Sequence, residues 1–272
     1  MLWTPNTDRP TDIVDINWDS PQAQGLLESV VISPYLRTAN NNASIITSGS
    51  GAGATIETIS EFTYALNTSG GTNHSAHFTL PQSLPSVTNF TFASWAYRLS
   101  DFSYGGFGGV TSPTHRVVID LSSSGAKLGY VWENTADEVD ANQLNVPLNE
   151  WTLVALVVSS TAATLYSISS TYGFTSWTNT KTHNAQDFSG QSWYIGNDSY
   201  GDGTLFNFPG YTAAQYIALR SLSSFEIWSL YSPDTRWDLY QKTRRWWFGS
   251  PAARKAPPLP SRSISRLIGA GY

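Results

Sequence analysis

Short segments rich in β-branched and aromatic residues alternate with Gly, Asn, Ser and Pro turns from about Ser44 onward. The pattern is typical of an antiparallel all-β domain, because such side chains suit a pleated, half-buried surface and the turn residues suit tight reversals. Helical periodicity is nearly absent. The segments predict strands at residues 90–99, 116–121, 127–133, 151–159, 163–169, 193–196 and 215–220.

The segment at 90–99, FTFASWAYRL, carries large apolar side chains on both faces of a strand. Trp95 and Tyr97 fall on one face, and Phe90 and Phe92 fall on the other. Such a strand must be covered on both sides, which predicts a central position in a sheet. Because many short strands follow one another without alternating helices, we expect an antiparallel β-sandwich of the jelly-roll type.

One short helix is predicted within 221–231. Ser223 as N-cap and Glu226 three residues later form a capping box, in which each side chain satisfies an amide of the first turn, and Pro233 ends the helix. We expect it to pack against the edge of the sandwich through its apolar side chains, Leu222, Phe225, Trp228 and Leu230.

The chain divides into three parts by composition. Residues 1–43 predict an extended N-terminal lead-in, 44–232 the sandwich, and 233–272 a basic, aromatic and Pro-rich C-terminal arm. The arm holds eight Lys and Arg against two Asp, a net charge of +6, whereas the whole chain carries −5 and residues 1–232 therefore carry −11. An acidic body with a basic arm is typical of an interaction segment.

Composition narrows the classes of function. Charged residues make up only 13% of the chain, which is typical of an extracellular or virion β-protein. The absence of cysteine excludes disulfides, cysteine zinc sites and a thiol nucleophile. The residues after Met1 predict no secretory signal, and the longest apolar run, 151–158, is far shorter than a membrane span.

An ordered series of motifs resembles the laminin-G-like or concanavalin A-like lectin/glucanase sandwiches, in the form common in bacteriophage virion proteins. The motifs are FTFASWAYRL at 90–99, LNEWTLVALVVSSTAATLYSIS at 148–169, SWYIGND at 192–198 and FPGYTAAQYIALRSLSSFEIWSLY at 208–231. The sequence departs from the family at the turn 159–162, which lacks the usual Asp-Gly cue. The segment SPDTRWDLYQKTRRWWFGSPA after Tyr231 is similar to the C-terminal ends of such phage proteins.

The resemblance implies a non-enzymatic structural protein of a tailed-phage virion. Capsid decoration is the expected role, with the terminal arms anchoring a lectin-like sandwich to capsid or tail subunits and with homo-oligomers in the particle. An alternative is a carbohydrate-binding or receptor-binding module of a tail or fibre. A third hypothesis is that the protein is a glycoside hydrolase.

The hydrolase reading depends on carboxylates. Glycanases of this fold carry E-x-D-x-x-E on one strand, so that nucleophile, helper and acid line one face of a groove. Glu138 and Asp140 supply the first two positions, but no carboxylate occupies the third. We therefore expect no catalytic residues and no enzyme activity.

A polar, glycine-containing loop at 197–203 is a candidate sugar or calcium site through Asn197, Asp198, Tyr200 and Asp202. Tyr200, Phe206 and Tyr211 are rings that could stack on a sugar, although packing and simple turns explain the same residues. His74, His77, His115 and His183 are scattered and predict no zinc site. Calcium is thus the one cofactor that the sequence leaves open.

The segment Arg244, Arg245, Trp246, Trp247 and Phe248 is the candidate partner-binding site. Three adjacent aromatic residues cannot all face one core, and Trp and Arg dominate protein interfaces. The alternative is that the segment closes an edge strand of its own sandwich. The acidic body disfavours specific nucleic-acid binding. Docking of the segment at a membrane surface is a third use, but we expect no membrane partner.

Overall fold

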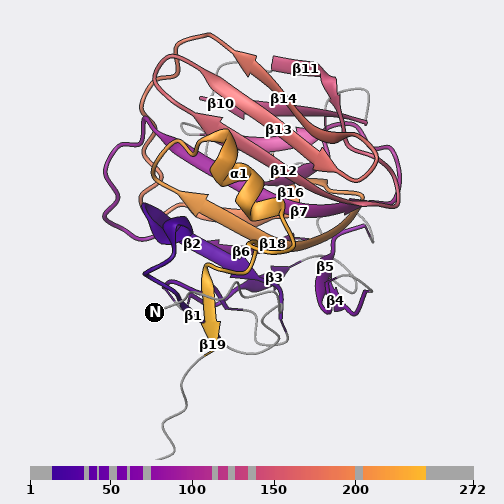
Figure 1. Ribbon diagram of the computed structural model, residues 1–272, viewed down its shortest axis with the longest axis horizontal. Coiled ribbons are helices and arrows are strands. Elements are labelled where there is room, and N and C mark those ends of the chain that lie inside the picture. Colours follow the sequence, from indigo (N-terminus) through magenta and orange to yellow (C-terminus); the bar gives the residue numbers. More distant parts are fainter. Residues whose placement is uncertain are drawn as a thin grey trace, which may run out of the picture. The chain divides into compact units, whose positions relative to one another are not determined.

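Two β-sheets pack face to face as an antiparallel sandwich (Figure 1), which confirms the predicted fold class. The computed structural model describes residues 14–33, 37–41, 43–48, 54–59, 62–69, 75–111, 116–121, 126–133, 139–199 and 205–242. Within that part of the chain, no helix combines the length and the apolar character that crossing a bilayer requires.

The first sheet has nine strands among the described residues, with the path β11-β10-β9-β8-β15-β6-β3. The short hairpin β16–β17 joins it where β17 pairs in parallel with β8. The strands are β3 (Ile46–Ser48), β6 (Ser75–Thr79), β8 (Gly106–Thr111), β9 (Arg116–Leu121), β10 (Lys127–Trp132), β11 (Val139–Asn145), β15 (Ser192–Ile195), β16 (Asn197–Ser199) and β17 (Leu205–Asn207).

The second sheet has eight strands in the described ranges, with the path β14-β13-β12-β7-β18-β5-β4. β18 pairs with β5 through its first residues and with β2 through its later residues, so both strands lie along the same side of it. The strands are β2 (Leu26–Val31), β4 (Thr55–Glu57), β5 (Ala65–Asn67), β7 (Phe90–Arg98), β12 (Trp151–Val158), β13 (Ala163–Ser169), β14 (Gly173–Asn179) and β18 (Gly210–Ala218).

The strands that the sequence predicts are all present, and most begin and end within a residue of the predicted positions. The exception is β18, which begins five residues before the predicted Gln215. The sequence pattern misses this start because the first residues of β18 are held by pairing with two neighbours: Tyr211 and Thr212 pair with β5 and also with β7.

β7 lies in the middle of the second sheet with both faces buried, as its sequence predicts. Phe90 and Phe92 point into the core between the two sheets, where they contact Trp193 of β15. Trp95 points to the outer face of the same sheet and belongs to a second hydrophobic cluster. The second sheet is therefore the middle layer of the fold.

The outer layer consists of α1 (Ser224–Tyr231) and the segment that follows it (Figure 1). Ser223 caps α1 with the predicted capping box to Glu226. Ile227 and Leu230 of α1 are buried on the sheet, and so are Trp237 and Leu239 beyond the helix. The chain then enters β19 (Tyr240–Lys242), which pairs with β1 (Val14–Ile16).

The apolar side chains around α1 pack on the sandwich to different extents. Leu222 and Leu230 are buried, but Phe225 is 76% exposed and Trp228 is 43% exposed. The reason is the rotation of the helix: with Ile227 fully buried, Phe225 lies two residues away and points to the opposite side. The expectation that all four pack on the sandwich was therefore wrong for Phe225, whereas Trp228 is partly exposed but still contacts Phe174 of β14.

Residues on both sides of the predicted domain boundaries contribute to the fold. Inside the predicted lead-in, β2 is a strand of the second sheet, and the 3₁₀ helix η1 (Pro21–Ala23) accepts a hydrogen bond from Tyr216 at Gln22. Inside the predicted arm, Trp237, Leu239 and Tyr240 are buried. Residues 26–31 and 237–240 are thus part of the sandwich, while the three-part division of the chain stays a prediction.

Candidate functional site

Many of the residues that the sequence predicts as functional lie outside the described part of the chain. This holds for Tyr200 and Asp202 of the loop, for Glu138, and for the partner-binding segment. The residues of that segment are Arg244, Arg245, Trp246, Trp247 and Phe248. Their roles stay predictions.

Asn197 is the loop residue whose side chain the structure describes, and it is fully buried in β16. Its Nδ2 donates a hydrogen bond of 2.6 Å to Oδ1 of Asn207, the residue opposite it in β17. Asp198 follows in the same strand. Asn197 thus fastens the β16–β17 hairpin, and no group of three or more acidic or histidine side chains that could hold a metal is found among the described residues. Calcium or sugar binding by this loop stays a prediction.

The two described rings near this loop belong to different sheets. Phe206 of β17 contacts Tyr104 with ring centroids 6.0 Å apart. Tyr211 of β18 contacts Tyr97 of β7 at 6.1 Å, on the outer face of the second sheet. Tyr211 is therefore grouped with the outer layer and not with the loop.

A cavity of about 120 Å³ opens on that outer face, and we call it the aromatic cavity. Its buried floor is formed by Trp95 of β7 and Trp151 of β12. Phe62 holds both indoles in place, with ring centroids 5.0 Å from Trp95 and 4.5 Å from Trp151. The lining residues are Trp95, Glu150, Trp151, Ser170, Tyr231, Pro233 and Arg236.

One wall of the aromatic cavity comes from the end of α1. The ring of Tyr231 stacks on Trp95 with centroids 5.4 Å apart and an interplanar angle of 17°. Pro233 prevents the helix from continuing, and the turn that follows is closed by a 2.9 Å bond from the amide of Arg236 to the carbonyl of Ser232. This turn brings the guanidinium of Arg236 to 5.2 Å from the ring of Trp95, within the range of a cation–π contact.

The lining of the aromatic cavity also includes a carboxylate held in a fixed orientation. Glu150 lies directly before β12 and accepts bonds from Ser170 Oγ at 2.5 Å, from the Thr171 amide at 2.9 Å and from Thr171 Oγ1 at 2.5 Å. The turn that presents these donors ends at Gly173, whose φ of +68° is a conformation that favours glycine. The β13–β14 turn therefore positions Glu150 at the mouth of the cavity.

Glu150 is held in its charged form. Partial burial by itself raises the pKa of this carboxyl, but the hydrogen bonds from Ser170 and Thr171 outweigh burial and lower the pKa below the ordinary value of 4.5. Near neutral pH Glu150 is thus a negatively charged acceptor with part of its lone-pair capacity open to a ligand.

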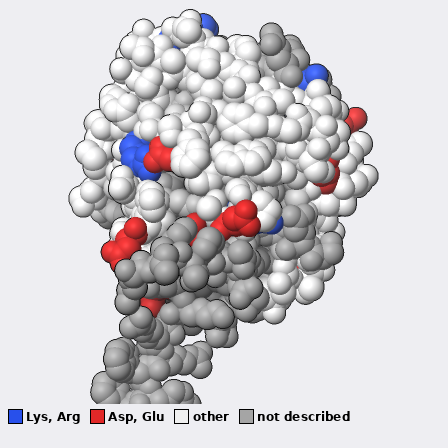
Figure 2. Space-filling model, viewed as in Figure 1, with Lys and Arg blue, Asp and Glu red and all other residues white. Residues whose placement is uncertain are grey.

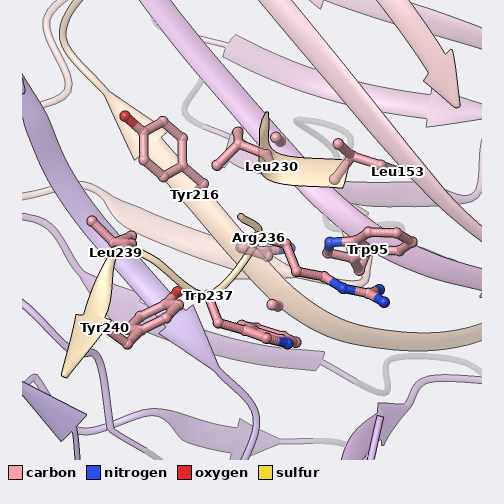
Figure 3. A pocket seen from close by; sticks show the side chains of 11 residues that line it. Trp95, Leu153, Tyr216, Leu230, Arg236, Trp237, Leu239 and Tyr240 are labelled. Atoms are coloured by element: carbon pink, nitrogen blue, oxygen red, sulfur yellow. The ribbon is translucent and has the colours of Figure 1, made fainter. Parts of the chain in front are cut away.

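A smaller cavity of about 30 Å³ lies beside the aromatic cavity, under the segment after α1 (Figure 3). Trp95 and Arg236 line both cavities. The figure shows the guanidinium of Arg236 beside the indole of Trp95, with Trp237 nearby. This space fits water and no larger molecule, so we assign it to the packing of the outer layer.

Exposed aromatic rings flank the aromatic cavity. Trp228 of α1 contacts Tyr231 at 5.3 Å and Phe174 of β14 at 6.1 Å between ring centroids. Trp228 and Phe174 are 43% and 39% exposed, so they extend the aromatic lining onto the surface. Exposed rings that join a cavity are typical of a binding site.

The side of the molecule that carries α1 is mostly uncharged (Figure 2). Charged side chains of the described residues are few and scattered on it. Glu226 of α1 forms an ion pair of 2.6 Å with Arg220. A surface of this kind favours contacts through rings and neutral hydrogen-bonding groups over electrostatic attraction to a highly charged partner.

The lining of the aromatic cavity offers contacts for a small ligand. Glu150 is the single carboxylate among the described residues that line it, whereas most glycosidases use two. The volume of about 120 Å³ is below the roughly 300 Å³ at which pockets for drug-sized ligands begin, so the cavity suits one small ring. Aromatic faces, a carboxylate and a hydroxyl are the groups that bind an amphipathic ring of this size.

Sequence reasoning missed this cavity because its residues are far apart in the chain and each has another evident explanation. The sequence pattern indicates a core position for Trp95 and Trp151. It indicates the end of a helix for Tyr231 and a basic arm for Arg236. The one local signal is the pair Glu150-Trp151 at the start of a strand, where a charged residue precedes a large ring.

The fold is similar to solved structures at low sequence identity. Domain 4 of AbnA, a GH43 extracellular arabinanase from Geobacillus stearothermophilus in complex with arabinotriose, aligns with a TM-score of 0.55 and 14% identity over 76% of this chain and 98% of that one. The binding domain of botulinum neurotoxin DC in complex with rat synaptotagmin II aligns with a TM-score of 0.54 and 12% identity over 76% of this chain and 51% of that one.

The binding domain of Paraclostridial Mosquitocidal Protein 1 aligns with a TM-score of 0.51 and 14% identity over 77% of this chain and 52% of that one. The chain thus spans about half the length of the two toxin binding domains. At these identities the likeness indicates the fold alone. The chain matches no family model and no curated protein sequence.

Proposed function

We propose that the protein is a non-enzymatic carbohydrate-binding module and that the aromatic cavity is its binding site. The observation that carries the proposal is the stack of Tyr231 on Trp95 in the lining of a ring-sized cavity that Glu150 also lines. A sugar ring would place its C–H face on the aromatic floor and donate a hydroxyl to Glu150. Arg236 would donate from the helix side.

The structural neighbours agree with this proposal at the level of fold. The arabinanase domain, nearly all of which this chain spans, was solved with arabinotriose bound. The two toxin neighbours are binding domains. The sandwich is therefore a fold on which recognition sites occur, while the argument for this chain rests on its own cavity.

A glycan microarray with the full-length protein tests the proposal. We expect wild type to bind a subset of glycans and Tyr231→Ala to lose that binding, because the substitution removes a wall of the cavity. Phe225→Ala is the matched control: it removes a ring of the same helix that is 76% exposed and does not line the cavity. Absence of binding by wild type, or equal binding by Tyr231→Ala, would overturn the proposal.

We also propose that this module is displayed on a tailed-phage particle as a decoration protein, alone or as part of an oligomer. The basis is the charge contrast between residues 233–272, at +6, and residues 1–232, at −11, together with the motif series. Immunogold labelling of purified particles tests this placement. Labelling over the capsid is the expected result, and absence of label from particles would exclude it.

A further inference from the structure

The outer face of the second sheet carries a line of side chains that runs from the aromatic cavity across five strands. We call it the cross-strand row. Trp151 of β12 pairs with Tyr97 of β7, and Tyr97 pairs with Tyr211 of β18. Tyr211 pairs in turn with Asn67 of β5, and Asn67 pairs with Thr55 of β4. Residues directly opposite each other in neighbouring strands share a face. Because Trp151 lies on the outer side of the sheet, the other four residues of the row lie there too.

The row is continuous with the aromatic cavity and open to solvent beyond it. Trp151 is part of the cavity floor. The ring of Tyr97 lies 5.4 Å from Trp151 and 6.1 Å from Tyr211, so aromatic contacts extend outward from the cavity. The rest of the row, from Tyr97 to Thr55, is half-buried, and each side chain therefore presents part of its surface.

The far end of the row is held rigid by a second carboxylate. Glu57 accepts hydrogen bonds from Asn67 Nδ2 at 2.7 Å and from Thr55 Oγ1 at 3.3 Å. It also accepts a bond from the hydroxyl of Tyr211, whose pKa is raised by burial and further by Glu57. Glu57 thus fixes Tyr211, Asn67 and Thr55 relative to one another before any ligand arrives, which lowers the entropic cost of binding.

The dimensions and charges of the row define an occupant. Four intervals between neighbouring strands of about 4.8 Å give a track of roughly 19 Å, the length of a short oligosaccharide. Rings at one end and amide, hydroxyl and carboxylate groups at the other suit a chain of amphipathic sugar rings. Among the described residues, Glu57 contacts the far end of the track, and Glu150 and Arg236 line the cavity end, where Arg236 lies over the ring of Trp95. Two carboxylates disfavour an acidic glycan.

On this basis, and resting on the proposed function of the aromatic cavity, we propose that the ligand is a neutral, linear oligosaccharide of about four units. One terminal or internal ring occupies the aromatic cavity, and the following units lie across β7, β18 and β5 along the cross-strand row. Affinity then depends on chain length, because each added unit reaches a further strand. A chain of acidic sugars binds more weakly than a neutral chain of equal length.

Isothermal titration calorimetry tests the inference with linear arabino-, xylo- and cello-oligosaccharides of one to about six units, and with oligogalacturonates as acidic counterparts. For wild type we expect the dissociation constant of at least one neutral series to fall with length up to about four units and then to level off. Length-independent affinity, or equal affinity for the acidic series, would overturn the inference. Binding of no neutral series would overturn it as well.

The variant Tyr211→Ala tests the cross-strand row independently of the aromatic cavity. We expect it to bind a tetrasaccharide about tenfold more weakly than wild type and a monosaccharide equally well, since it removes a ring on the third strand of the row only. Tyr211→Phe keeps the ring and should retain the gain with length. The matched control is Tyr194→Ala, which removes a half-buried tyrosine from β15 of the other sheet.

The outcomes distinguish the two proposals. If Tyr211→Ala bound the tetrasaccharide as tightly as wild type, the cross-strand row would be overturned as a binding surface. The proposal for the aromatic cavity would be unaffected. Loss of binding to every glycan, in wild type as well, would overturn the proposed function itself. The length series on wild type decides the inference even where Tyr211→Ala fails to fold, and thermal unfolding of each variant identifies such a failure.

Discussion

Trp95 in the middle of β7 and Tyr231 at the last residue of α1 stack with their ring planes 17° apart and their centroids separated by 5.4 Å. The two residues are 136 positions apart in the chain, and their contact joins the outer layer to the middle sheet. The same contact forms a wall of the aromatic cavity. The contact between Trp95 and Tyr231 therefore contributes both to the stability of the outer layer and to the shape of the aromatic cavity.

Tyr231→Ala is predicted to lower the free energy of unfolding by about 1–2 kcal/mol, because it removes a half-buried ring and its contacts with Trp95 and Trp228. Tyr231→Phe keeps both ring contacts and should lose less stability than Tyr231→Ala. Urea unfolding of the three proteins measures the differences. A loss as large for Phe as for Ala would show that the hydroxyl, and not the ring, is responsible.

Glu150 is predicted to contribute stability that depends on acid pH. Its pKa in the folded state lies below 4.5, since the hydrogen bonds of Ser170 and Thr171 outweigh burial, so its contribution is present above about pH 4.5 and is lost as the pH falls through the folded value. Glu150→Gln should therefore show a smaller loss of stability than wild type between pH 7 and about pH 3. Parallel pH dependence of the two proteins would contradict the assignment.

Tyr216 is predicted to make the fold sensitive to alkali. Burial raises its pKa to about 12, and its hydroxyl donates a 2.7 Å bond to the carbonyl of Gln22. Its neutral form is favoured in the folded state, so stability is complete below the unfolded value near 10 and falls by up to about 2–3 kcal/mol as the pH rises towards 12. Tyr216→Phe should lose about 1 kcal/mol at neutral pH and show a weaker decline between pH 9 and pH 11. If the stability of Tyr216→Phe declined as steeply as that of wild type over this pH range, Tyr216 would not be the group responsible.

Truncations separate the segment after α1 from the rest of the C-terminal region. A chain that ends at Lys242 should unfold at nearly the same urea concentration as the full-length protein. A chain that ends at Ser232 should lose at least about 3–5 kcal/mol, because Trp237 and Leu239 are buried on the second sheet and β19 pairs with β1. Equal stability of the two truncated proteins would contradict the assignment of residues 233–242 to the sandwich.

The longer central strands and the one α-helix of the described residues are predictable from local sequence. Alternating and continuous apolar segments predict seven of the strands, and Ser223 with Glu226 predicts the start of α1 to the residue. These signals are local, because a strand face or a helix cap depends on side chains a few positions apart. The pairing of β2 with β18 is not predictable in this way, since residues 26–31 become a strand only through a partner nearly two hundred positions later.

The site is less predictable than the fold for a related reason. Both faces of β7 are apolar, so the sequence does not indicate which face carries a second core and which part of it stays open. The face that holds Trp95 is covered by α1 where Leu230 packs, and is open where Glu150 and Ser170 meet Tyr231. That boundary depends on where the chain turns after Pro233. A loop rich in Asn, Asp and Gly is a stronger local signal of binding, which is why the sequence favours residues 197–203 instead.

A crystal structure of the full-length protein with a bound neutral tetrasaccharide tests the central claim most directly. The account predicts one sugar ring in the aromatic cavity, packed on Trp95 and Trp151 with a hydroxyl bonded to Glu150, and further units along Tyr97 and Tyr211. Sugar bound at the loop 197–203 or elsewhere, with the aromatic cavity empty of sugar, would contradict it.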